Sequence, residues 1–152
     1  MADVSLVDVP FRPAVTQSVT IELMGPPKGK GRPRFVRRTG HAYTPQPTRS
    51  YEAALRYAAQ VKMGNYPPIE GAVRIEVLAA FPVPVSWPNN RRADALSGVV
   101  RPTSKPDADN LLKSLGDAFN GVVWRDDSQI VTALISKRYS DRPRLWVQVE
   151  AV

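Results

Sequence analysis

Residues 105–130 constrain the fold of this chain most strongly, because they have the pattern of one complete amphipathic helix followed by a turn. Pro106 and Asp107 suit the first turn of a helix, and Asn120-Gly121 suits its end. Apolar residues between these limits recur at the spacing of a single helical face: Leu111, Leu112, Leu115, Ala118 and Phe119. We therefore expect a helix that packs on a core through this face.

The same segment concentrates acidic residues in a chain whose formal net charge is +7. Its carboxylates are Asp107, Asp109, Asp117, Asp126 and Asp127. The rest of the protein favours an anionic partner, which these residues would repel, so their clustering suggests a site. A divalent metal reconciles the two, because Mg²⁺ takes carboxylate oxygens and shares its remaining positions with water and phosphate.

Each of these acids also has a structural interpretation. Asp107 can cap the helix, Asp109 and Asp117 can pair with Lys113 at i, i+4 spacing, and the last two acids can be turn residues. Their occurrence together, in this order and in a basic chain, favours a metal site. Whether the turn returns the second acidic pair to the helix start depends on tertiary structure.

Composition limits the other kinds of chemistry. A pI of about 10.1 favours a polyanion such as nucleic acid, or an anionic membrane. The chain has no cysteine and only one histidine, His41, which excludes disulfides, thiolate zinc sites, Cys nucleophiles and His-rich metal sites. No apolar run approaches a membrane span and the N-terminus lacks the pattern of a signal peptide, so we expect a cytoplasmic protein.

A basic stretch, residues 25–47, is interrupted by Gly and Pro and is predicted to be a loop. We interpret it as a flexible arm that contacts phosphates, with Phe35 or Tyr43 available to stack on a base; a merely solvated loop is the alternative. The basic residues of this loop are Lys28, Lys30, Arg32, Arg34, Arg37 and Arg38.

A second irregular segment, residues 82–104, is rich in proline and leads directly into the acidic motif. Loops of this length are usually functional or disordered. We favour a mobile flap that contacts DNA, in which Trp87 stacks on a base or packs on the protein surface.

The remaining pattern predicts a single domain over residues 1–152. After a lead-in at 1–17, alternating apolar residues indicate strands at 18–24, 72–81, 129–139 and 144–152. A further helix is expected at 48–63. The order β-α-β-α-β-β, with a final hairpin, predicts a two-layer α+β domain with a mixed sheet and helices on one face.

The motifs K-P-D-x-D-N-L-x-K, D-A-x-N-G and W-x-D-D-S-Q resemble the RusA family of Holliday junction resolvases, which is common in phages and prophages. The resemblance implies a homodimeric, Mg²⁺-dependent endodeoxyribonuclease that resolves four-way DNA junctions by paired symmetric nicks in recombination and repair. It implies that Asp107, Asp109 and Asp127 bind metal and are catalytic, and that Lys113 assists. Asp126 is the alternative to Asp127. Lys105, at the entrance to the motif, joins the basic residues as an expected DNA contact.

Two other functions fit the same residues. A non-catalytic nucleic-acid binder would use the acids only for folding. A different metal nuclease of phage type, acting on flaps or other branched DNA, would keep the chemistry and change the substrate. In either nuclease, the absence of a Ser-His-Asp or Cys-His system makes direct attack by water the simplest mechanism.

Overall fold

A computed structural model describes residues 17–30, 34–43 and 46–152, and it contains a four-stranded mixed sheet. The strand order is β1 (Ser18–Met24), β6 (Arg144–Ala151), β4 (Val73–Phe81) and β5 (Ile130–Tyr139). β6 pairs antiparallel with both of its neighbours, whereas β4 and β5 are parallel. This confirms the predicted α+β class and mixed sheet. The predicted final hairpin is wrong, because β4 lies between β5 and β6 and pairs with both.

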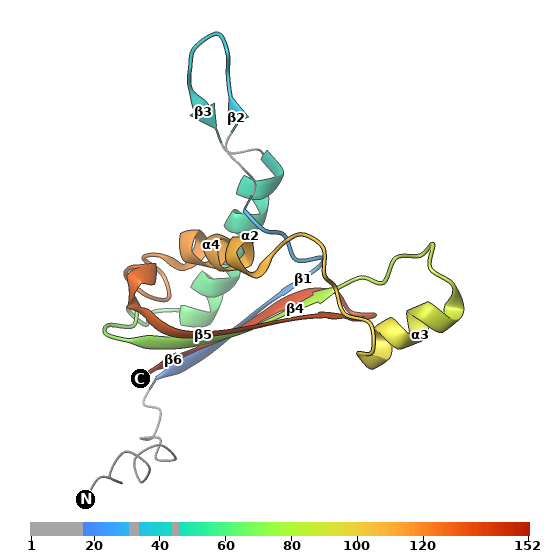
Figure 1. The fold of residues 1–152 in the computed structure, drawn as a ribbon. Helices are drawn as coiled ribbons and strands as arrows, with labels where there is room; N and C mark the ends of the chain where they lie inside the picture. Colours follow the sequence, from blue (N-terminus) through green and yellow to red (C-terminus); the bar gives the residue numbers. More distant parts are fainter. Residues whose placement is uncertain (1–16, 31–33, 44–45) are drawn as a thin grey trace, which may run out of the picture.

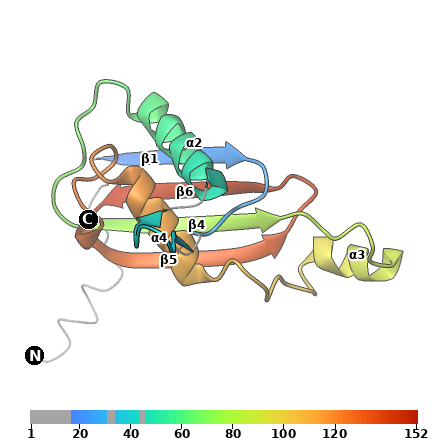
Figure 2. The same ribbon diagram turned by 90° about the horizontal axis from the view of Figure 1, so that it is seen from above.

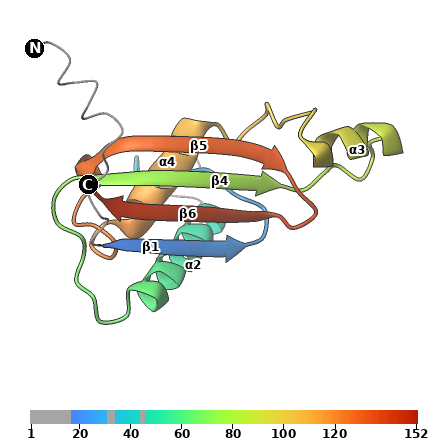
Figure 3. The same ribbon diagram turned by 90° about the horizontal axis from the view of Figure 1, so that it is seen from below.

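Two helices, α2 (Gln46–Met63) and α4 (Ala108–Phe119), cover one face of the sheet (Figures 1 and 2). In the part of the chain that the structure describes, no helix covers the opposite face, which Figure 3 shows from below. The core lies between the helices and the sheet. It contains the alternating residues of β4 and the apolar face of α4: Val73, Ile75, Val77, Ala79, Leu111, Leu115, Ala118 and Phe119.

Burial of this kind holds α4 in place. A fully buried Leu or Phe side chain contributes roughly 1.5–3 kcal/mol, and Leu111, Leu115 and Phe119 are each fully buried. The polar face of α4 is thereby fixed toward solvent, on the side of the helix away from the sheet. The predicted helix end is also confirmed, since α4 is followed by Asn120 as its C-cap and by Gly121 with φ 79°.

The basic stretch 25–47 is more regular than predicted. Strands β2 (Arg34–Phe35) and β3 (Ala42–Tyr43) form a short antiparallel hairpin, which projects away from the sheet in Figure 1. The turn between them is closed by hydrogen bonds from the N–H groups of Thr39 and Gly40 to the Val36 carbonyl. Glycine suits the position at 40 because its φ is 69°.

The prediction of an irregular segment at 82–104 is wrong for helix α3 (Asn89–Ser97), which lies beyond the end of β4 (Figure 2). Pro88 takes the N-cap position in extended conformation, and Gly98 ends the helix with φ 87°. Trp87 anchors the helix start: its ring meets Tyr139 edge to face at 5.3 Å, and the Arg91 guanidinium lies 3.9 Å above it.

Residues 82–129 form the crossover that joins the parallel strands β4 and β5, and they contain both α3 and α4. Parallel strands require such a connection.

A register shift between Val73 and Arg74 interrupts the pairing of β4 with β5. Val131 therefore falls outside the alternation predicted for this strand, and it is 62% exposed.

No described helix is both long and apolar enough to cross a bilayer. The predicted lead-in lies, apart from Gln17, outside the described residues.

Candidate active site on helix α4

The start of α4 presents two of the candidate carboxylates to solvent. Asp107 is the N-cap, and its Oδ1 accepts a hydrogen bond of 2.8 Å from the Asn110 N–H. Asp109 lies in the first turn, where the helix dipole stabilises negative charge. Both side chains are exposed. Capping and metal binding are compatible for Asp107, because a carboxylate has two oxygens that can accept several contacts.

Lys113 lies one turn further along the same face. Its Nζ is 3.0 Å from Oδ2 of Asp109, and the two side chains are 59% and 70% exposed. An exposed i, i+4 pair of this kind contributes only about 0.3–0.5 kcal/mol. The structure therefore forms the ion pair that the i, i+4 spacing predicts. The small stability that this pair contributes does not by itself explain why a lysine occupies position 113.

The turn that carries the second acidic pair is anchored by Trp124, which is fully buried. Its indole Nε1 donates a 2.7 Å hydrogen bond to Oδ1 of Asn120, and its ring meets Phe119 edge to face at 5.5 Å. Arg56 of α2 donates from Nη1 to the Asn120 carbonyl at 3.0 Å. These contacts hold the chain that leaves α4 against the core, and they direct residues 125–129 back along the helix.

Asp126 and Asp127 have different surroundings. Asp126 caps a short 3₁₀ helix, Asp127–Gln129, by accepting from the Ser128 N–H at 3.0 Å. Hydrogen bonds from the Ser128 side chain and backbone hold the pKa of Asp126 below its usual range. Gln129 completes a capping box by accepting from the Asp126 N–H. Asp126 is thus engaged in local structure, and Asp127 is the acid of the pair that faces α4.

Gln129 is a structural residue that the sequence analysis passed over. Its Nε2 also donates 2.8 Å hydrogen bonds to the carbonyls of Ile69 and Gly71, which fixes the turn to the segment before β4. The signal was present, since D-x-x-Q is the spacing of a capping box.

The Asp127 carboxylate packs against Gly116 of α4. A Cβ built on Gly116 would lie 2.6 Å from Oδ2 of Asp127, closer than non-bonded atoms approach. Gly116 is seven residues after Asp109, and therefore about 10 Å further along the helix axis at 1.5 Å per residue. Asp109, Lys113 and the Asp127 carboxylate thus follow one side of α4.

The three candidate metal ligands are not gathered at one point. Throughout residues 17–30, 34–43 and 46–152, no group of three Asp, Glu, His or Cys side chains is arranged to hold a metal ion. The donors nevertheless suit Mg²⁺ in kind, because all three are exposed carboxylates. Mg²⁺ commonly takes only one or two protein carboxylates and fills its other positions with water and phosphate.

The loop before the hairpin lies directly on α4. Lys30 forms an ion pair with Asp117 through its Nζ, and its N–H donates to the Asn110 carbonyl at 3.3 Å. Glu52 of α2 lies beside this pair: desolvation, followed by the charge of Asp117, raises its pKa. The sequence contains no local signal for the Lys30–Asp117 contact, because 87 residues separate the partners.

The other basic candidates have different positions. Arg37 and Arg38 lie in the exposed turn of the hairpin, and Lys28 and Lys105 have exposed side chains near α4. Arg34 is in strand β2, and Arg32 falls outside the described residues. Charges that can reach phosphate thus lie both on the projecting hairpin and beside the acids.

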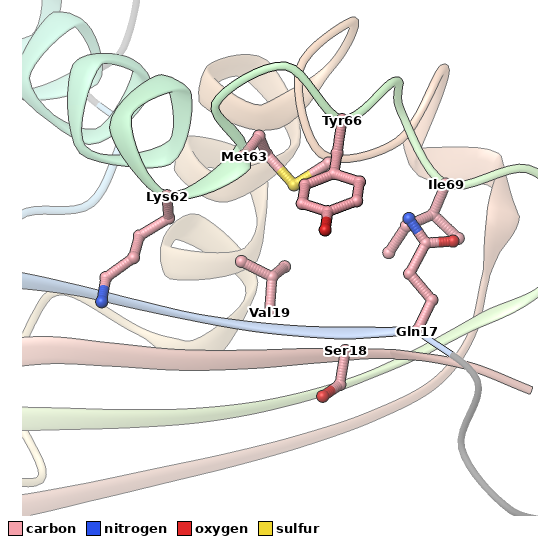
Figure 4. A pocket seen from close by; sticks show the side chains of 7 residues that line it. All are labelled: Gln17, Ser18, Val19, Lys62, Met63, Tyr66 and Ile69. Atoms are coloured by element: carbon pink, nitrogen blue, oxygen red, sulfur yellow. The ribbon is translucent and has the colours of Figure 1, made fainter.

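A separate cavity of about 280 Å³ lies between the end of α2 and the start of β1 (Figure 4). Its lining includes Lys62, Met63, Tyr66 and Ile69, and none of its lining residues is acidic. It therefore has no part in the candidate site.

Two comparisons with known proteins agree. The family model described as "Endodeoxyribonuclease RusA" matches residues 24–150. A protein of Bacillus subtilis (strain 168), named "Uncharacterized protein YqaN", is 36% identical over 138 residues, which cover 88% of this chain and 96% of that protein. The family match begins at the end of β1, includes the basic loop and the acidic motif, and ends within β6.

Proposed function

The chain belongs to the RusA endodeoxyribonuclease family, and on that basis we propose that it resolves four-way DNA junctions by paired symmetric nicks in recombination and repair. The observation that carries the proposal is the arrangement on α4. There, Asp109, Lys113 and the carboxylate of Asp127 follow one side of the helix, and Asp107 is the exposed N-cap at its start. We further propose a homodimer, because two symmetric sites suit two strands of like polarity.

We propose that Asp107, Asp109 and Asp127 supply carboxylates to Mg²⁺. Bound Mg²⁺ supplies positive charge that stabilises the transition state of phosphodiester hydrolysis and makes water more acidic. The exposure of all three carboxylates supports this assignment, as does the close approach of the Asp127 carboxylate to α4.

Lys113 is proposed to offset charge on the phosphate or on the leaving oxygen. Its ammonium lies on the same side of α4 as the acids and is 59% exposed, so a DNA backbone can reach it. Preorganised charge of this kind acts in the transition state, where it contributes much more than a surface ion pair.

DNA binding is proposed to use the hairpin and the exposed lysines near α4. Arg37 and Arg38 at the hairpin turn, with Lys28 and Lys105, present positive charge toward solvent. Arg34 and Arg32 belong to the same proposed interface. Contacts of this type position the protein on the phosphate backbone and do not read sequence. We place this activity in the cytoplasm of a bacterium or of a phage-infected host cell.

One assay separates this function from its alternatives. A four-way junction, a flap and a linear duplex are each incubated with purified protein, with and without Mg²⁺. Resolution of the junction that requires Mg²⁺ and gives two symmetric nicks is the expected result. Preferential cutting of the flap would assign the protein to the second nuclease class. Binding without cutting in either condition would assign it to the non-catalytic class.

A further inference from the structure

We propose that Lys30 is a positioning residue: it fastens the loop that precedes the β2–β3 hairpin to helix α4, and it is not one of the phosphate contacts. The inference rests on the proposed function for its catalytic consequence only. Its structural part stands on contacts between residues 28–30 and α4.

The backbone of this loop lies so close to the start of α4 that there is no room for a side chain at Gly29. A Cβ on Gly29 would lie 2.7 Å from Cβ of Pro106 and 2.9 Å from Cβ of Asn110. The Lys30 N–H donates to the Asn110 carbonyl, and Ser114 Oγ donates to the Lys28 carbonyl at 3.5 Å. Three consecutive loop residues therefore touch the first two turns of the helix that holds the proposed catalytic acids.

The Lys30 side chain continues this contact along the helix. Its ammonium pairs with Asp117, and only 32% of its side chain is exposed. The hydrogen bond to Asp117 raises the pKa of Lys30, so the group is charged at neutral pH. A phosphate that contacted Lys30 would have to compete with a carboxylate already in place, and would approach the negative charges of Asp117 and Glu52.

Lys28 provides the contrast on the same loop. Its side chain is exposed, and within the described residues it has no ion-pair partner. The two lysines are only two positions apart in the sequence, but their electrostatic environments differ. Lys28 can neutralise a phosphate, whereas the charge of Lys30 is already matched by Asp117.

The contact between this loop and α4 would affect where bound DNA lies relative to the candidate site. The hairpin with Arg37 and Arg38 follows this loop along the chain, and α4 holds Asp107, Asp109 and Lys113. Fastening the loop to α4 fixes the position of a DNA strand on the hairpin relative to these residues. Loss of the contact should therefore slow cleavage of bound DNA and leave the number of phosphate contacts unchanged, because small displacements of reacting groups reduce rates steeply.

The test compares Lys30→Ala with Lys28→Ala and with Lys62→Ala, an exposed lysine at the far end of α2. For Lys30→Ala we expect an unchanged slope of log K against log salt for junction binding. Single-turnover cleavage at saturating DNA should fall at least roughly tenfold. Lys28→Ala should lower the slope by roughly 0.9, and Lys62→Ala should change neither quantity.

A charge swap supplies the rescue: Lys30→Asp with Asp117→Lys should recover cleavage relative to Lys30→Asp alone. The inference is overturned if Lys30→Ala lowers the slope as Lys28→Ala does while bound DNA is cut at the normal rate. It is also overturned if the swap gives no recovery in a folded protein.

Hydrogen exchange separates failure of this inference from failure of the proposed function. If the unaltered protein cuts no DNA, the peptide that contains Lys30 can still be followed in Lys30→Ala, Asp117→Ala and the double variant. Equal acceleration of exchange in all three supports the fastening contact. Additive acceleration, or none, overturns it.

Discussion

The Asp127 carboxylate occupies the space beside Gly116 that a side chain would fill, with Oδ2 only 2.6 Å from the position of a Cβ. Glycine in a helix interior is about 1 kcal/mol less favourable than alanine, so this helix gives up stability where Asp127 approaches it. The contact joins the acidic turn to the helix that holds the other two candidate ligands.

Gly116→Ala should displace the Asp127 carboxylate and lower the rate of Mg²⁺-dependent cleavage. Global stability should change little, because the end of an aspartate side chain can move aside. In an Asp127→Ala background the same change should stabilise the protein by up to about 1 kcal/mol, since the helix gains alanine without a clash. Urea denaturation of the four proteins checks this coupling. Identical effects of Gly116→Ala in both backgrounds would contradict it.

Asp109→Asn should abolish cleavage while junction binding is kept or tightened. The amide has the size of the carboxylate but lacks the charge that attracts Mg²⁺, and it no longer repels phosphate. The same outcome is expected for Asp107→Asn and Asp127→Asn. Asp141→Asn, in the turn between β5 and β6, is the matched control and should cut normally. Full activity of Asp109→Asn would remove it from the site.

Lys113→Ala should fold and bind a four-way junction but cut it at least roughly 100-fold more slowly at saturating Mg²⁺. As a partner of Asp109 alone it would contribute only about 0.3–0.5 kcal/mol, and its loss would hardly alter the rate. Lys113→Arg should recover part of the activity, because a guanidinium does not place its charge where an ammonium does. Single-turnover rates distinguish the two roles, and a near-normal rate for Lys113→Ala would favour the ion-pair role.

Neutralising the two arginines of the hairpin turn should weaken DNA binding without changing the candidate metal ligands. Each of Arg37→Gln and Arg38→Gln should lower the slope of log K against log salt by roughly 0.9 for duplex arms, if each arginine neutralises one phosphate. Binding titrations at several salt concentrations provide the slopes. Unchanged slopes in both variants would show that the hairpin turn is only solvated.

Glu52→Gln should stabilise the protein at neutral pH. Desolvation raises the pKa of Glu52 above its ordinary value of 4.5, and its Oε1 is buried without a hydrogen-bond partner among the described residues. The pKa of Glu52 is higher in the folded state than in the unfolded state, so ionisation of this carboxyl opposes folding. The loss of stability develops as the pH rises from 4.5 through the raised pKa. The difference in free energy of unfolding between Glu52→Gln and the unaltered protein should therefore vanish below pH 4.5 and be largest above the raised pKa. Denaturation midpoints measured across this range check the sign.

The main elements were predictable because their signals are local. The alternation in 18–24 and the helical spacing from Leu111 to Phe119 each describe one element with one buried face, and the structure confirms both. Helix α3 was missed because Pro88 and the polar residues after it resemble a loop. Pro88 is in fact the N-cap, and Gly98 is the stop.

Contacts between distant segments could not be predicted in the same way. Lys30 and Asp117 are brought together by the packing of a loop on α4, and nothing near either residue identifies the other. The approach of Asp127 to Gly116 depends on the buried Trp124 and on the capping box around Asp126. The choice of Asp127 as ligand and the whole metal set remain predictions of the motif.

The crossover from β4 to β5 contains α3, α4 and the acidic turn, and this has a consequence for how the protein can vary. The entropy of closing a connection grows only with the logarithm of its length, so that doubling a flexible loop costs about 0.6 kcal/mol. Exposed insertions between Pro82 and Lys105 should therefore cost the sheet and α4 little stability, as long as the contact of Trp87 with Tyr139 is kept. The connection can thus vary in length while the residues from Asp107 to Asp127 keep their places.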